Sequence, residues 1–322
     1  MKRLIIILVV VLLGGYLSLT MLGGSGNFSA EKKLWKLEQE YKTIAADPEA
    51  SPDNVYSDLH VGYDKFIIKA KDKKFINVAH MMKSNLYILQ ENYAKARENY
   101  EIVATSGNHT MALQAVVSIG RTYAKEKNEL ALLDNYQRII ANFPKSQMGL
   151  KVPLLVAQYY VKENQISLVE KSFYDAELHY RKLYEENIDT PLGFYALQYL
   201  SVTYVTQQKW EKALDAYQTS LFKYADYNVW TPESLMKWVR TVNTIAITKH
   251  KSFEYPVGLY NEFIQNKPDH PFTPIFEKVL VSLKEIKEKS TSIDTVVEDT
   301  LNNAINNISA EGVQMESPAI SE

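Results

Sequence analysis

The chain of 322 residues contains no cysteine, and this absence excludes disulfides, thiol catalysis and thiolate metal sites. It also excludes a lipid-modified amino terminus, because the stretch from Leu12 to Gly15 leads to no cysteine that could be acylated. Strand signals are poor as well, since no run with period-two alternation is bounded by turn residues. The sequence therefore predicts an all-α protein without thiol chemistry.

The chain also lacks an excess of charge. Its formal net charge is −2, whereas nucleic-acid binding usually requires a basic excess gathered on one face. We therefore expect no nucleic-acid partner. Nearly half of the composition, 46%, is hydrophobic, which is enough to bury a large core.

Motifs for catalysis, metals and nucleotides are missing. No two of the six histidines have the i, i+4 spacing that places two metal ligands on one helix face; they are His60, His80, His109, His179, His250 and His270. Neighbouring carboxylates such as Glu185 and Glu186 point in different directions on a helix. The glycines at positions 23, 24 and 26 follow an apolar run and form no strand-to-helix phosphate loop. We expect no catalytic residue, no metal and no cofactor.

What the chain does have begins at its amino terminus. Lys2 and Arg3 precede an uncharged stretch from Leu4 to Leu22, which would span about 28 Å as a helix, close to the thickness of a bilayer core. This pattern predicts a membrane anchor or export signal, and residues 1–26 include its flexible linker. Small residues at 24–26 leave cleavage open, in which case the protein would be secreted to the periplasm.

The orientation of this anchor follows from the cations. Lys2 and Arg3 favour a cytoplasmic amino terminus, although Lys32, Lys33 and Lys36 follow the span and oppose it. The short leader makes the first orientation simpler, so we expect the rest of the chain outside the cytoplasm, in a bacterial periplasm.

A repeated spacing of small and aromatic residues dominates the middle of the chain. Four times a small residue precedes a tyrosine by three positions, and a second tyrosine follows 13 or 20 residues later. The quartets are Ser84, Tyr87, Ala96, Tyr100; Gly120, Tyr123, Leu132, Tyr136; Ala157, Tyr160, Ala176, Tyr180; and Ser201, Tyr204, Ala213, Tyr217. We interpret these tyrosines as core residues that fill the gaps beside closely approaching helices.

The first tyrosines of the quartets lie 36, 37 and 44 residues apart. The last gap falls to 37 when a seven-residue excess, about two helical turns near Glu163 to Val169, is set aside. A period near 34 is typical of stacked helix pairs that bury their apolar faces only against neighbours. A long helical bundle without such stacking is the alternative fold.

The chain resembles the tetratricopeptide repeat family, whose members carry a small residue, a tyrosine, an alanine and a second aromatic at these positions. The segment from Leu113 to Pro144 matches best, and Trp210 occupies a further aromatic position in the fourth unit. The junction from Phe143 to Ser146 is similar to one found in bacterial envelope members, namely outer-membrane assembly lipoproteins and cell-division coordinators. The missing cysteine departs from the lipoproteins.

This resemblance implies an α-solenoid of antiparallel helix pairs. We expect a degenerate amino-terminal pair at residues 27–76, four repeats at 77–228, and a degenerate repeat with a closing helix at 229–288. Ser51 and Pro52, and then Thr231 and Pro232, predict helix starts in the two end segments. Residues 289–322 lack aromatics and predict a mostly disordered acidic tail, with a transient or partner-induced helix near 293–308.

The resemblance also implies a concave groove that binds protein segments. Carried over by register, its residues are Met81, Asn85, Ile88, Leu89, Val117, Arg121, Lys125, Leu154, Gln158, Lys162, Tyr195, Gln198 and Val202. Three cations, Arg121, Lys125 and Lys162, are predicted to attract an acidic segment. Met81 stands where a carboxylate-clamp member of the family has lysine, which disfavours that binding mode.

The function implied is a non-catalytic adaptor or scaffold at the extracytoplasmic face of a membrane, acting in envelope assembly or secretion. One alternative is a chaperone-like accessory of protein export. An alternative of another class is an enzyme subunit, which would need a polar cavity with convergent titratable groups.

Overall fold

The computed structural model describes residues 25–289 of the chain. The predicted membrane span at residues 4–22 and the predicted tail with its helix near 293–308 lie outside these residues. None of the helices within 25–289 combines the length and apolarity needed to cross a bilayer.

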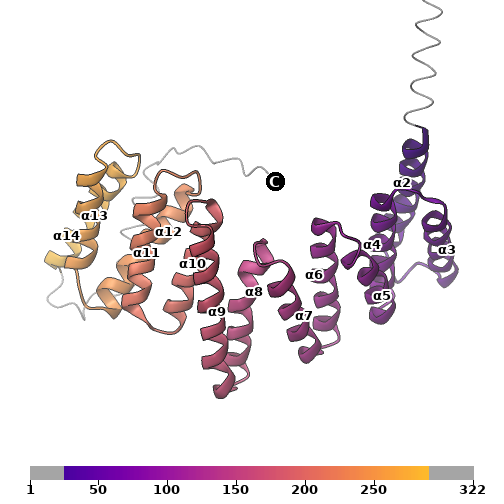
Figure 1. The fold of residues 1–322 in the computed structure, drawn as a ribbon, viewed down its shortest axis with the longest axis horizontal. Helices are drawn as coiled ribbons and strands as arrows, with labels where there is room; N and C mark the ends of the chain where they lie inside the picture. The colour runs from indigo at the N-terminus through magenta and orange to yellow at the C-terminus, as the bar shows by residue number, and fades with distance from the viewer. Residues whose placement is uncertain (1–24, 290–322) are drawn as a thin grey trace, which may run out of the picture. The chain divides into compact units, whose positions relative to one another are not determined.

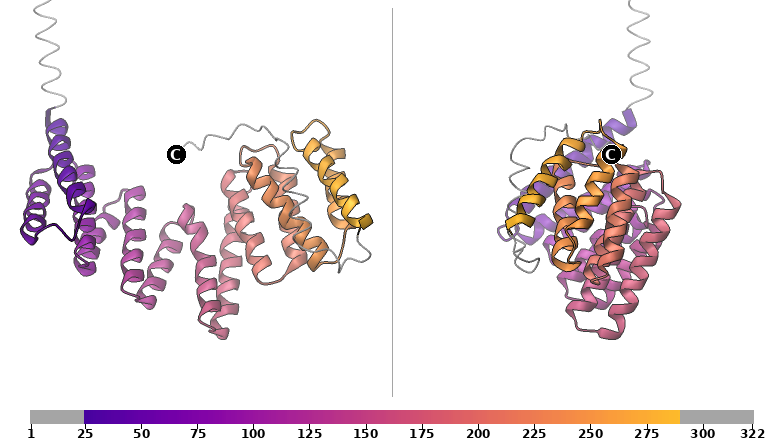
Figure 2. Two further views of the ribbon diagram at one scale, coloured as in Figure 1. Left: turned by 180° about the vertical axis from the view of Figure 1, so that it is seen from behind. Right: turned by 90° about the vertical axis from the view of Figure 1, so that its left-hand side faces the viewer.

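The described part of the chain is all-helical and contains no strand. It divides into two units on either side of the Phe143–Pro144 bond, so two of the four predicted repeats fall in each. Figures 1 and 2 show the helices of each unit as successive antiparallel neighbours. The first unit contains α2 (Ser25–Ala46), α3 (Asp53–Lys69), α4 (Lys73–Leu89), α5 (Tyr93–Ala104), α6 (His109–Lys125) and α7 (Glu129–Asn142). The second contains α8 (Gln147–Lys162), α9 (Ile166–Glu186), α10 (Pro191–Thr206), α11 (Trp210–Tyr224), α12 (Pro232–Thr244), a π-helical turn (Ile245–Lys249), α13 (Glu254–Asn266) and α14 (Thr273–Lys289).

The same turn joins the two helices of every repeat. Glu91, Lys127, Asn164 and Gln208 have φ between 52° and 57°, and each lies four residues after the first tyrosine of its quartet. In each turn the next residue donates its N–H to the carbonyl of that tyrosine, at 2.9–3.0 Å. This is the bond pattern of a Schellman helix end. The backbone therefore repeats with the same spacing as the tyrosines, which confirms the helix-pair units.

The small residues of the quartets are buried as predicted. Ser84, Ala157 and Ser201 are inaccessible, and a side chain on Gly120 would begin 2.7 Å from the amide nitrogen of Asn135. The first tyrosines are less buried than predicted. Tyr87, Tyr123 and Tyr160 are partly exposed, and the guanidinium of Arg97 lies 4.6 Å from the ring centre of Tyr123. These rings close the edge of the core, where a cation can cover them.

The seven extra residues of the third repeat lengthen α9, which has 21 residues against 12 in α5. The buried Tyr180 of α9 replaces hydrogen bonding that α8 loses around Pro153, a proline inside that helix. The Tyr180 hydroxyl accepts from the N–H of Leu154 at 3.1 Å and donates to the carbonyl of Leu150 at 2.6 Å. Because these two groups normally bond each other, the hydroxyl is inserted into the hydrogen-bond ladder of α8.

The neighbouring His179 completes this repair. It hydrogen-bonds the carbonyl of Gly149, which is the group that Pro153 leaves without its helical donor. Burial lowers the pKa of His179, while this bond opposes the shift. His179 and Tyr180 thus fix α9 against the opened turn of α8.

The end segments form helices at the predicted places. Thr231 caps α12 in a capping box with Ser234, and Pro232 is its first residue. Pro52 was predicted to be the first residue of the next helix after the cap Ser51. In the structure Pro52 occupies the cap position and α3 begins at Asp53. The π-helical turn after α12 was not predicted.

Candidate functional site

The second unit contains a pocket of about 370 Å³ between α10 and α12, beside α11. Twelve residues line it: Phe194, Tyr195, Gln198, Tyr199, Val202, Tyr217, Val229, Trp230, Ser234, Lys237, Trp238 and Thr241. Half of them are aromatic: Phe194, Tyr195, Tyr199, Tyr217, Trp230 and Trp238. Aromatic walls with few polar groups are typical of ligand and peptide sites.

The start of α10 is held in place by close backbone packing. Thr190 caps the helix and Pro191 is its first residue. A side chain on Gly193 would begin 2.2 Å from the carbonyl oxygen of Asn187, so only glycine fits there. The same added carbon would also lie 2.6 Å from the Tyr224 hydroxyl. This hydroxyl donates to the carbonyl of Ile188 at 2.6 Å. These contacts fix the wall of the pocket that α10 supplies.

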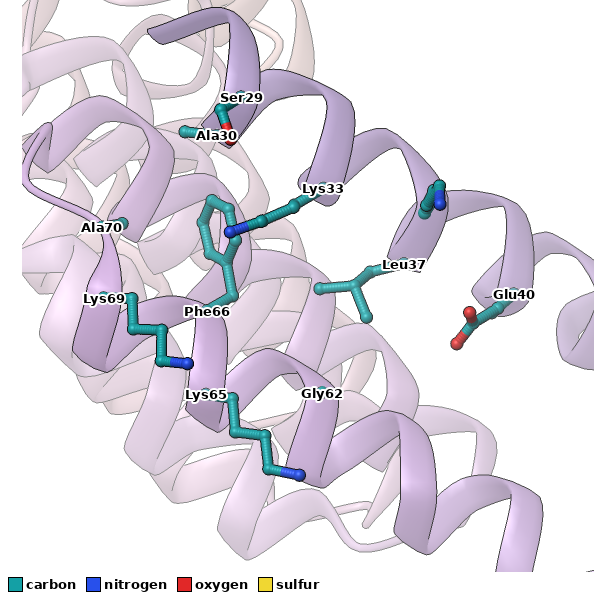
Figure 3. Close-up of a pocket in the computed structure, with 11 residues that line it drawn as sticks. Ser29, Ala30, Lys33, Leu37, Glu40, Gly62, Lys65, Phe66, Lys69 and Ala70 are labelled. Carbon is teal, nitrogen blue, oxygen red and sulfur yellow. The ribbon is translucent and has the colours of Figure 1, made fainter. Parts of the chain in front are cut away.

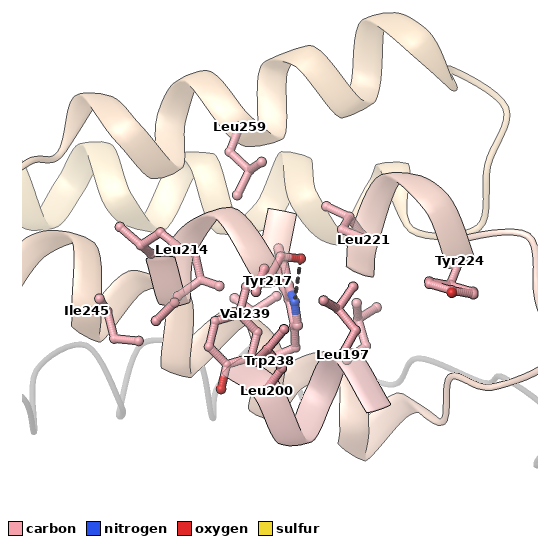
Figure 4. Packing of buried hydrophobic residues seen from close by; sticks show 14 of the residues in the cluster. Leu197, Leu200, Leu214, Tyr217, Leu221, Tyr224, Trp238, Val239, Ile245 and Leu259 are labelled. Carbon is pink, nitrogen blue, oxygen red and sulfur yellow. Dashed lines mark hydrogen bonds between the residues drawn. The ribbon is translucent and has the colours of Figure 1, made fainter. Parts of the chain in front are cut away.

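The floor of the pocket is a hydrogen-bonded tryptophan. The indole N–H of Trp238 donates to the Tyr217 carbonyl at 3.2 Å (Figure 4). It also lies 3.2 Å from the Ser220 hydroxyl. Gln198 reaches down from α10 and donates to the same hydroxyl at 3.1 Å. Trp230 packs beside this floor, with its indole N–H bonded to the Tyr224 carbonyl at 2.9 Å. Both indole donors are satisfied internally, so the rings present mainly apolar surface to the pocket.

The pocket is neutral except for one cation. Burial raises the pKa of Tyr199, and it raises the pKa of Tyr217 to about 12, so both phenols are protonated at neutral pH. Lys237 is the only charged residue among those that line the pocket. It is exposed and makes no ion pair within residues 25–289. The site therefore offers aromatic surface with a positive charge at its edge.

Three predicted groove residues meet in this pocket. Tyr195 and Val202 are each 39% exposed, and they share one face of α10 with Gln198. The other predictions in this unit fall elsewhere. Leu154 is 7% exposed and belongs to the core, so the prediction that it lines an open groove is wrong. The register argument assumes a regular helix, whereas Pro153 opens α8 one residue earlier.

Gln158 and Lys162 are exposed on α8 but do not line the pocket. The amine of Lys162 lies 3.4 Å from the carboxylate of Glu163. Its charge is thus partly balanced by its neighbour, and an exposed pair of this kind has little influence on a distant partner.

The predicted apolar groove residues of the first unit are largely taken up by packing. Met81 and Ile88 pack on the core of α5 and α6, and Leu89 packs on the core of α2 to α4. Asn85 accepts a hydrogen bond of 2.5 Å from the Tyr100 hydroxyl. Because these contacts are internal, the four residues offer less free surface than the sequence suggested.

The remaining predictions in the first unit lie on α6. Val117 is half-buried, whereas Arg121 and Lys125 are exposed. The adjacent Glu126 does not neutralise them, because it forms a two-bond fork with Arg97 at 2.6 and 3.2 Å. Arg121 and Lys125 make no ion pair within the described residues, so they form a small positive surface of the first unit.

Sequence reasoning missed the second wall of the pocket. Trp230, Lys237, Trp238 and Thr241 come from the segment at 229–288 that we predicted as a degenerate end repeat, without assigning it groove residues. The available signal was Thr231 and Pro232, which start α12 and make it the next first helix after α10. Its exposed positions then belong to the same face as those of α10.

Within residues 25–289, no group of three or more histidine, aspartate or glutamate side chains is placed to hold a metal ion. A scan against protein-family models and a search of curated proteins both gave no match to this chain.

Proposed function

We propose that this chain is a non-catalytic adaptor of the tetratricopeptide kind, in which the pocket between α10 and α12 holds a segment of another protein. The observation that carries the proposal is the open aromatic pocket with Lys237 at its edge. Its volume, about 370 Å³, lies at the small end of ligand sites and suits a few side chains of a peptide. Tyrosine and tryptophan are also the residues that most often dominate protein interfaces.

The chemistry of the pocket defines the segment that fits it. A bulky apolar or aromatic side chain would pack on Trp238 and Tyr195. An acidic residue or a terminal carboxylate next to it would pair with Lys237. The predicted anchor at residues 4–22 would hold this adaptor at a membrane, with the helix pairs on the extracytoplasmic side. Envelope assembly or secretion is the setting that we propose for it.

The test uses photo-crosslinking in cells. A photo-reactive residue replaces Val202, which is exposed in the pocket, and the crosslinked proteins are identified by mass spectrometry. We expect one recurrent partner. In the same background, Tyr195→Ala and Lys237→Glu should each reduce that crosslink about ten-fold, as for loss of an interface hot spot.

Matched controls lie elsewhere on the second unit. Tyr174 is 64% exposed on α9 and Lys171 is exposed on the same helix, and neither lines the pocket. Tyr174→Ala and Lys171→Glu should leave the crosslink unchanged. Circular dichroism checks that each variant is folded. A crosslink that survives both pocket substitutions in folded protein would reject the adaptor pocket.

A further inference from the structure

A second cavity, of about 490 Å³, opens between α2 and α3 in the first unit. Leu37 and Phe66 lie at its base, and lysines project from both helices around them (Figure 3). The helices are close at Gly62, where an added side chain would begin 2.7 Å from a methyl group of Leu37. The base of the cavity is therefore closed by packing, while its mouth is lined with amines.

The charge of this cavity is not balanced. Lys33 and Lys36 from α2 and Lys65 and Lys69 from α3 line it, with Glu40 as its single carboxylate. None of the four lysines makes an ion pair within residues 25–289. By contrast, Lys83 in the same unit pairs with Asp64 at 2.5 Å. Four amines without acidic partners attract an anionic ligand or surface.

Large apolar side chains on the same two helices also face solvent. Phe28 and Trp35 are 68% and 57% exposed on α2, and Ile68 is 82% exposed on α3. Phe28, Lys32 and Trp35 follow an i, i+4, i+7 spacing and share one side of α2, turned away from the buried Leu34 and from Leu37 in the cavity. Exposed aromatics mixed with lysine are the composition of helices that lie in a membrane interface.

The position of α2 in the sequence also favours contact with a membrane. The helix begins at Ser25, directly after the apolar stretch at residues 4–22. If that stretch spans a bilayer, the lysines of α2 lie within the short distance where anionic headgroups act on juxtamembrane cations.

We propose that the exposed surface of this first helix pair docks on an anionic bilayer surface, with lipid phosphates seated among Lys33, Lys36, Lys65 and Lys69. An acidic polypeptide would also satisfy the amines. It would not account for the exposed apolar side chains of Phe28, Trp35 and Ile68 on a helix pair that follows the predicted span in sequence, and for this reason the lipid surface is favoured. The docking would fix how this first helix pair is held relative to the membrane. The linker was predicted to run to residue 26, whereas α2 already begins at Ser25.

The absence of cysteine makes a site-specific test direct. Ile68→Cys carries an environment-sensitive fluorophore in the full chain, reconstituted into nanodiscs that contain lipids with brominated acyl chains. The discs hold phosphatidylcholine alone or mixed with phosphatidylglycerol. We expect several-fold quenching in the anionic discs, little in the neutral discs, and loss of the effect at high salt. A label at Gln137→Cys, exposed on α7 of the same unit, should remain unquenched in both.

Charge reversal provides the matched control. The triple variant Lys33→Glu, Lys65→Glu, Lys69→Glu should restore emission at position 68 in the anionic discs. Reversal of three exposed lysines of the second unit, Lys151, Lys171 and Lys249, should not. Equal quenching in neutral and anionic discs, or none in either, would overturn the proposal. A label that stays unquenched but responds to added polyglutamate would also overturn it, and would assign the lysines to an acidic polypeptide.

Discussion

Each unit of this chain has an apolar core, but the side-chain contacts that stand out between the helices of each unit differ. In the first unit, two-bond arginine forks link neighbouring layers: Arg97 binds Glu126, and Arg138 binds Glu101 at 2.6 and 2.8 Å. In the second unit, rings meet across five helices. Trp230 lies 4.8 Å from Phe194 and 6.3 Å from Trp238, and Trp238 lies 6.4 Å from Phe276, measured between ring centres.

The two kinds of contact contribute differently to the free energy of unfolding. Partly exposed ion pairs contribute little and weaken with salt, whereas each buried aromatic side chain contributes several kcal/mol through lost water contact. The pocket between α10 and α12 therefore stands on the larger and more aromatic of the apolar cores. The first unit has two smaller apolar clusters, one around α2 to α4 and one around α5 and α6.

The largest effect is expected at the centre of the aromatic core. Trp238 is 2% exposed, so Trp238→Ala should destabilise the second unit by about 3–5 kcal/mol through a large cavity and the loss of its hydrogen bonds. Hydrogen exchange followed by mass spectrometry, on the full chain during urea unfolding, resolves the two units. Protection in α10 to α13 should fall, while α4 to α7 remain protected.

The same substitution at the exposed tryptophan of the first unit is the control. Trp35 is 57% exposed, and Trp35→Ala should change stability by no more than about 0.5 kcal/mol. Equal losses at the two positions would mean that the aromatic core is not what distinguishes the units.

A smaller effect is expected from a single methyl group at Gly193. Gly193→Ala places that group against the Asn187 carbonyl and the Tyr224 hydroxyl, so α10 must shift, at a cost of about 2–3 kcal/mol. Gly258 on α13 has no atom within 4 Å of the same position, and Gly258→Ala should stabilise its helix by up to about 1 kcal/mol. Thermal unfolding of both variants measures the opposite signs. Similar shifts for both would show that α10 is not tightly packed.

The next effect concerns hydroxyl groups at equivalent positions in the two units. Tyr180→Phe removes the hydroxyl inserted between Leu150 and Leu154, and the buried backbone groups lose a partner, at about 2 kcal/mol. In Tyr100→Phe the lost partner is the side chain of Asn85, which can turn toward water, so about 1 kcal/mol is expected. Urea midpoints at constant slope provide the comparison. A larger loss at Tyr100 would reverse it.

Local signals in the sequence predicted the helix pairs well. Quartet spacing, the cap at Thr231 and the proline at Pro232 each act within one or two turns, so they can be read without knowing what packs nearby. The burial of Leu154 could not be read in this way, because it depends on how Tyr180 of another helix responds to Pro153.

The candidate sites were predicted only in part, for the same reason. Tyr195, Gln198 and Val202 followed from the register of one helix, but the facing wall with Trp238 required knowing that α12 packs next to α10. The basic cavity was missed because Lys33 and Lys36 were considered only as topology signals. Their partners Lys65 and Lys69 lie about 30 residues away in sequence and come near only once α2 and α3 pack.

The smallest effect is expected in the repeated turns, where each unit holds a non-glycine residue at positive φ. Lys127 of the first unit has φ 55°, a conformation that costs a lysine about 1 kcal/mol, so Lys127→Gly should stabilise the chain by about 0.5–1 kcal/mol. Asn164 of the second unit has φ 52°, but asparagine tolerates this region, and Asn164→Gly should change stability by about zero. Both residues are exposed and both turns have the same hydrogen bonds, so the pair isolates backbone strain. Thermal melts of the two variants measure the difference, and a gain at Asn164 as large as at Lys127 would show that side-chain identity does not set the cost of the turn.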